Sequence, residues 1–130
     1  MTYIKINGVL SPATISGRVA DKDWDNRASK SITLEMDYAT AIALFVDGLA
    51  WSIIQKDEVP VYQVDEDGKA VLDENGNPIQ TGTEMQENEF DNSEYDVAGP
   101  ITDNRNGTIT VKMGKITAAE ALAELQEVLA

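Results

Sequence analysis

Residues 31–55, SITLEMDYATAIALFVDGLAWSIIQ, are the densest concentration of bulky apolar side chains in this 130-residue chain. Apolar and polar residues alternate over 32–36, which predicts a half-buried strand. Asp37 is a good N-cap for the helix that we expect next, and Gly48 is placed to end that helix. A second strand is predicted over 49–55. Because the helix is apolar nearly all round, we expect it to be covered on more than one side.

The chain length corresponds to a single domain over residues 1–130, which is long enough to bury a substantial core. The sequence contains no cysteine and no histidine. Their absence removes disulfides, the usual zinc ligands and the usual general base at neutral pH. We therefore expect no enzyme, and we expect no cofactor and no metal. The start of the chain lacks the pattern of a signal peptide, and no run resembles a membrane span, so a soluble protein is expected.

The negative charge is concentrated in one segment. The formal net charge is −13, and residues 57–96 hold thirteen carboxylates against the single Lys69, a net charge of −12. The rest of the chain is therefore nearly neutral. Such a charge density, with few apolar residues, predicts an acidic and partly flexible excursion outside the core.

Before the central stretch, three short strands are predicted. Residues 3–6 alternate and lead into Asn7-Gly8, a pair that favours a type I′ turn. Residues 9–10 would return, Ser11-Pro12 would end that strand, and residues 13–20 would form a third one.

After the central stretch, Pro60 predicts that residues 59–64 form an edge strand, because proline cannot donate to a ladder. Residues 64–71 and 72–79 form a small repeat in which each copy carries an Asp-Gly or Asn-Gly turn signal. Residues 80–93 are almost wholly polar, and we expect them to be poorly ordered. Strands are predicted again over 95–99 and 108–113.

A final helix is predicted from its capping box, with Thr117 at the N-cap and Glu120 at N3. Its apolar stripe is expected to pack on the sheet, and a partner helix or a homodimer contact is the alternative. The stripe comprises Ala118, Ala121, Leu122, Leu125, Val128 and Leu129. The sequence therefore predicts an α+β domain with a mainly antiparallel sheet of five to seven short strands, two packed helices and an acidic hairpin-like excursion.

The loop over residues 21–27, DKDWDNR, allows three interpretations. Asp21, Asp23 and Asp25 have the alternate spacing with which a calcium loop begins, although the later ligand positions do not fit. Alternatively the acidic side chains are solvated or paired, and Trp24 folds back onto the sheet. In the third interpretation Trp24 is a candidate partner contact, since aromatic residues are enriched at interfaces.

Four stretches carry a resemblance to a known group of proteins: DKDWDNR (21–27), LFVDGLAWSI (44–53), ITDNRNGT (101–108) and VKMGK (111–115). Together they resemble small acidic proteins encoded in prophage tail and baseplate gene clusters of Gram-positive bacteria. The resemblance implies a virion or phage-assembly component and no enzyme. It also implies a location in the cytoplasm of the bacterial host, with incorporation into the virion as an alternative.

Two functions therefore stay open at this point. The first is a phage structural or assembly protein that acts as a protein–protein interaction module, with other phage or host proteins as partners and with no direct nucleic acid or membrane contact. The second is an acidic DNA mimic, whose carboxylates would occupy the basic groove of a host nucleic-acid-binding protein. A rigid mimic requires its acids on regular elements, whereas the sequence predicts them among turns.

Overall fold

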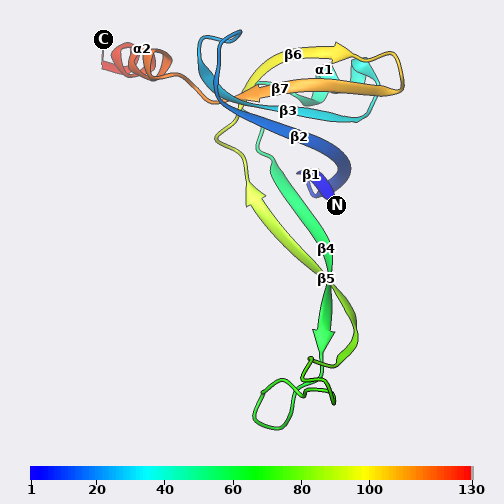
Figure 1. Cartoon of the computed structure of the whole chain (residues 1–130). Helices are drawn as coiled ribbons and strands as arrows, with labels where there is room; N and C mark the ends of the chain where they lie inside the picture. Colours follow the sequence, from blue (N-terminus) through cyan, green and yellow to red (C-terminus); the bar gives the residue numbers. More distant parts are fainter. Residues whose placement is uncertain (130) are drawn as a thin grey trace.

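A computed structural model describes the backbone of residues 1–129 and the side chains of residues 1–126. The described part of the chain forms seven antiparallel strands in the order β5-β4-β1-β2-β3-β7-β6, together with two helices (Figure 1). The elements are β1 (Thr2–Ile6), β2 (Val9–Asp21), β3 (Arg27–Glu35), α1 (Tyr38–Leu44), β4 (Ser52–Tyr62), β5 (Gln80–Asp91), β6 (Val97–Asp103), β7 (Thr108–Gly114) and α2 (Ala118–Leu129). The expected α+β class with a mainly antiparallel sheet is confirmed.

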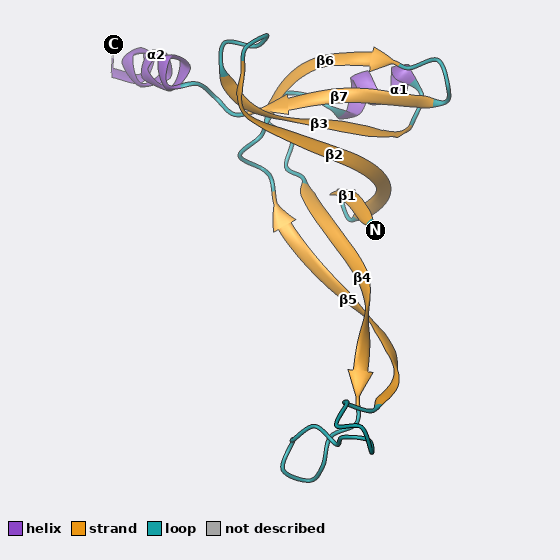
Figure 2. Cartoon of the chain, in the orientation of Figure 1, coloured by secondary structure: helices purple, strands orange, loops and turns teal. Residues whose placement is uncertain are grey.

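β2 is one long, strongly curved strand, and the expectation of two short strands separated by Ser11-Pro12 is wrong (Figure 2). Residues 9–12 pair with β1, whereas pairing with β3 begins at Ala13. Pro12 therefore lies where the strand changes partner, a position at which the missing N–H costs little. The turn before β2 is confirmed, because Asn7 and Gly8 both adopt positive φ, of 52° and 79°.

The core lies between the curved sheet and α1. Its fully buried side chains come from three strands, β1, β3 and β7, and from the segment that precedes β4: Ile4, Ile32, Trp51, Ile109, Val111 and Met113. The alternation predicted over 32–36 and 108–113 is confirmed, since Ile32 and Leu34 face inward beside Ile109 and Val111. This pairing places the apolar faces of β3 and β7 in one layer under the helix.

α1 begins as predicted but is covered on one side only. The Asp37 carboxylate accepts a hydrogen bond from the Thr40 N–H at 2.6 Å, which confirms the N-cap. Ala41 and Phe45 are buried, and α1 contacts β6 and β7. The expectation of cover on several sides is wrong, because Tyr38, Ile42 and Val46 are each exposed by more than two fifths. The helix has only two turns, so a single sheet face meets its buried side.

β4 and β5 form a long hairpin that extends away from the rest of the molecule (Figure 1). β4 pairs with β1 only over residues 52–55 and continues through Pro60 with β5 alone. Pro60 thus stands where β4 has a single neighbour, which suits a residue without an N–H donor. The expectation that residues 80–93 are poorly ordered is wrong for 80–91, which form β5. β5 is formed by backbone pairing with β4. Because both faces of this strand are exposed, its sequence needs no alternation of apolar and polar residues. The flexibility of residues 57–96 stays a prediction.

α2 does not pack on the sheet, so the expectation of two packed helices is wrong for this one. In the described part of the chain it makes no extended contact with a strand or with α1, and it projects from one end of the body (Figure 1). Val128 and Leu129 belong to the predicted apolar stripe, but their side chains are not among those that the structure describes. Within the residues that the structure describes, neither helix has the length and apolarity needed to cross a bilayer.

Candidate interaction surfaces

Trp24 is half-buried and lies against two glycines. A Cβ atom built on Gly99 would come within 2.6 Å of the indole ring, and one on Gly114 within 2.8 Å. The Arg27 guanidinium lies over the Trp24 ring, 4.7 Å from the ring centroid. These contacts support the interpretation that Trp24 folds back onto the sheet, since glycine at both positions is what lets the ring approach the backbone. The role of Trp24 as a partner contact stays a prediction.

Asp21 is fully buried, and its carboxylate is hydrogen-bonded to other groups of the protein. Its carboxylate accepts hydrogen bonds from Lys112 Nζ at 2.9 Å, from Ser29 Oγ at 3.1 Å and from the Asp23 N–H at 3.0 Å. The Lys112 hydrogen bond, helped by the Asp23 and Ser29 donors, holds the pKa of Asp21 below its ordinary value against the effect of burial. Among the described residues, no three acidic side chains converge as a metal site would require, in this loop or elsewhere. The geometry therefore gives the calcium interpretation no support.

Arg27 ties the start of α2 to the body. Its Nη1 and Nη2 atoms donate to the two carboxylate oxygens of Glu120 at 2.8 and 3.0 Å. The predicted capping box is confirmed, because Glu120 also accepts from the Thr117 N–H while Thr117 Oγ1 accepts from the Glu120 N–H. The Arg27 hydrogen bonds lower the pKa of Glu120 to about 2.

We expect Glu120→Gln to release α2 from its position while the sheet stays folded. The neutral amide loses both the ion pair with Arg27 and the strong acceptor for the Thr117 N–H. In the wild type the contact should be complete above pH 4.5, the ordinary pKa of the group, and should be lost as the pH falls toward about 2. Residual dipolar couplings of α2 relative to β3 would measure this. Glu124→Gln is the matched control, and equal effects of the two changes would contradict the assignment.

α2 presents its polar side to the body and its apolar side to solvent. Glu120, Ala123 and Glu124 line a hollow beside Asp47 and Gly48. Leu122 and Leu125, on the opposite side of the helix, are each 55% exposed. This orientation is the reverse of ordinary amphipathic packing, and it follows from the Arg27–Glu120 contact, which holds the acidic side inward.

The base of the β4–β5 hairpin is fixed by buried polar groups. Asn92 is buried, its N–H donates to the Trp51 carbonyl at 2.9 Å, and its side-chain oxygen accepts from Lys30 Nζ. The Trp51 indole N–H donates to the Tyr95 carbonyl at 2.9 Å, and Lys30 lies 4.6 Å from the Tyr95 ring centroid. The hairpin is therefore joined to the core through specific contacts on both of its strands. Two ion pairs near the base add to them, Lys5 with Glu89 and the N-terminus with Asp57.

The tip of the hairpin is built from the eight-residue repeat. In each copy the first aspartate, Asp65 or Asp73, accepts hydrogen bonds from the backbone N–H groups two and four residues later. Gly68 and Gly76 occupy equivalent positions with φ of 78° and 80°. The two copies are thus two equivalent turns, as the turn signals predicted.

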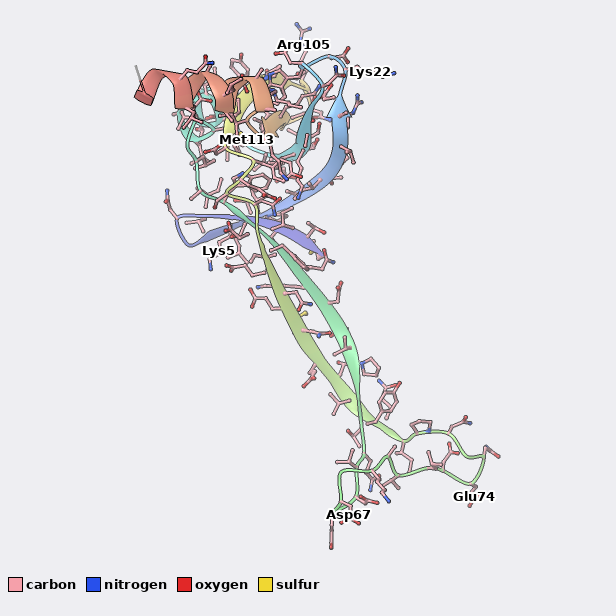
Figure 3. The ribbon with its side chains drawn as sticks, turned by 90° about the vertical axis from the view of Figure 1, so that its left-hand side faces the viewer. Lys5, Lys22, Asp67, Glu74, Arg105 and Met113 are labelled. Atoms are coloured by element: carbon pink, nitrogen blue, oxygen red, sulfur yellow. The ribbon has the colours of Figure 1, made fainter. Side chains whose placement is uncertain are left out.

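A ring of backbone hydrogen bonds joins these two turns to the hairpin. The Gln63 N–H donates to Ile79, the Ile79 N–H donates to Val71, and the Val71 N–H donates back to Gln63. The three residues are spaced eight apart, so the repeat generates a small three-lobed head in which β4 and β5 supply the third lobe. Figure 3 shows Asp67 and Glu74 at this head, far from Lys5 and Met113 in the body.

The hairpin carries exposed apolar side chains among its carboxylates. Those that are at least 45% exposed are Tyr62, Val64, Leu72, Met85 and Phe90. Every residue of β5 is exposed. Two strands without further cover are marginally stable in water, so an uncovered ribbon of this length suits contact with another molecule.

Comparisons with protein-family models, with curated proteins and with solved structures find no match to this chain. The geometry alone therefore defines the candidate surfaces. Sequence reasoning missed the anchoring role of Asn92 and the buried Asp21–Lys112 pair, because partners 62 and 91 residues away leave no local pattern.

Proposed function

We propose that this chain is a phage (prophage) structural or assembly protein that works as a protein–protein interaction module associated with the tail or baseplate. In this proposal residues 1–56 and 92–126 form a supporting body, and the β4–β5 hairpin is an acidic arm that engages other phage or host proteins. The protein would act in the cytoplasm of the bacterial host and could be carried into the virion. The phage assignment rests on the sequence resemblance described above.

One observation carries the interaction role. The hairpin is held at its base by the buried contacts of Asn92 and Trp51, yet its outer part contacts no other element among the described residues and exposes both faces. Ordering a long arm costs conformational entropy, and the free energy of the contacts within the arm hardly offsets that cost. A partner that covers the exposed apolar side chains and meets the carboxylates would supply the missing stabilisation.

A shortened hairpin tests this role. Glu58 and Met85 face each other in the ladder, so residues 59–84 can be replaced by Asn-Gly, which closes a two-residue turn. We expect the melting midpoint to change by less than about 5 °C, because the deleted part makes no contact with the core. Co-expression with the products of the neighbouring genes should show a partner that copurifies with the full chain and is lost from the shortened one. Retention of every such partner by the shortened chain would contradict the proposal, and an unfolded product would show that the hairpin supplies part of the core.

The DNA mimic is a second candidate, and one feature of β5 favours it. Glu87, Glu89 and Asp91 alternate along a regular strand, which places their carboxylates on one face about 7 Å apart. An arm of this kind meets the requirement for acids on regular elements. Displacement of duplex DNA from a host DNA-binding protein by the full chain, and not by the shortened one, would support this function.

A further inference from the structure

We propose that the outer edge of β5 accepts an extended segment rich in lysine or arginine from the partner protein, as one more antiparallel or parallel strand. The inference names the kind of partner that the hairpin takes, and it rests on the proposed interaction role. It concerns the free backbone edge of the strand and not the acidic side chains alone.

β5 is the last strand of the sheet and its outer edge is open. It pairs with β4 from Gln80 to Asp91, and the described residues place no other element beside it. Along such an edge, alternate N–H and C=O groups point to solvent and form a template for another strand. The twelve-residue length of β5 offers about six such positions.

The opposite edge of the same sheet, formed by β6, is protected against strand addition, whereas the β5 edge is not. β6 has only seven residues, contains Pro100, changes register between Ala98 and Ile101, and is contacted by α1. Each of these features hinders the addition of a strand. β5 contains no proline and no lysine, and its only irregularity lies at the tip, opposite Val61 and Tyr62. The charge of the β5 side chains is therefore the feature that selects which strand can pair with this edge.

That charge is entirely negative and selects the incoming strand. β5 carries Glu84, Glu87, Glu89 and Asp91 and no cation, while the neighbouring β4 adds Asp57 and Glu58 against the single Lys56. A second copy of this chain would bring its own carboxylates to the same edge, which is unfavourable. A strand with cationic side chains would gain cross-strand pairs on both faces, and Met85 and Phe90 would give it one apolar contact on each face.

Synthetic peptides test the inference on the full chain. The probe is a capped peptide of about eight residues that alternates Lys and Thr, and the matched control carries Pro in place of one central Thr. Both peptides have the same charge, but the proline peptide cannot complete a ladder. We expect amide hydrogen exchange at alternate β5 residues to slow by about tenfold with the first peptide and by less than about twofold with the second. Equal protection by the two peptides, or protection confined to the tip, would overturn the inference, and a capped Glu-Thr peptide should give no protection.

Two double variants separate the edge from general attraction between charges. Glu84→Gln with Glu87→Gln removes two carboxylates from β5, and Glu66→Gln with Glu74→Gln removes two from the tip, so the net charge is the same. The first pair should weaken binding of the Lys-Thr peptide by roughly tenfold and the second by less than about twofold. Equal weakening would show that only the total charge matters and would reject a role for the edge.

This test and the test of the proposed function fail in different ways. If the natural partner needs the hairpin but the Lys-Thr and proline peptides behave alike, the interaction role holds and strand addition is wrong. If the natural partners bind the shortened chain as well as the full one, the interaction role of the hairpin is wrong, whatever the peptides do.

Discussion

Phe45→Ala should lower the free energy of unfolding by about 3–5 kcal/mol. Phe45, the C-cap residue of α1, is 3% exposed, and its ring is the largest side chain that this segment buries in the core. Removing the ring leaves a cavity between α1 and the sheet that neither β6 nor β7 can fill, because β7 is held by its ladder to β3 and β6 is held by its ladder to β7. Chemical denaturation followed by tryptophan fluorescence would measure the loss, since Trp51 belongs to the same core.

Ile42→Ala is the matched control for this change. Ile42 lies on the same helix and is 49% exposed, so its truncation should cost less than about 1 kcal/mol. The pair of variants tests the finding that α1 is covered on one side only. Similar losses for the two residues would mean that α1 is covered as the sequence predicted.

Asp21→Ala should lower the melting midpoint at pH 7 by roughly 10 °C. The change leaves the Lys112 ammonium half-buried without its partner and removes the acceptor for Ser29 Oγ. Asp23→Ala, at an exposed position of the same loop, should leave the midpoint nearly unchanged. A melting midpoint of Asp21→Ala equal to that of the wild type would show that the buried pair adds nothing to stability.

The pH dependence of this difference has a definite sign. The pKa of Asp21 is lower in the folded protein than its ordinary value of 3.8. Its contribution is therefore complete above about pH 4 and is lost as the pH falls through the folded pKa. Thermal melts of the wild type and Asp21→Ala should differ most near neutral pH and converge in acid, and a gap that widens below pH 4 would contradict the assignment.

Much of the local structure could be predicted, because its causes are local. Asn7-Gly8 makes its turn, Asp37 and Thr117 cap their helices, and the two repeat copies make equivalent turns, since each depends on contacts within about four residues. The candidate surfaces were predicted less well. Trp24 is an aromatic residue in a polar loop, and its half-buried state depends on the distant Gly99 and Gly114 and on the Arg27 guanidinium that lies over its ring.

The sequence by itself determined the α+β class, the turns, the helix caps and the concentration of negative charge in one segment, because residue type and short-range spacing govern these features. The tertiary structure alone decided that β2 is a single bent strand, that residues 80–91 pair with β4, and that α2 turns its apolar side outward. Each of these depends on a partner far along the chain: β1 and β3 for β2, β4 for β5, and Arg27 for Glu120. Strand pairing satisfies the hydrogen bonds of the backbone, and ion pairs satisfy charged side chains, without requiring an apolar pattern. No periodicity in the sequence therefore predicts these contacts.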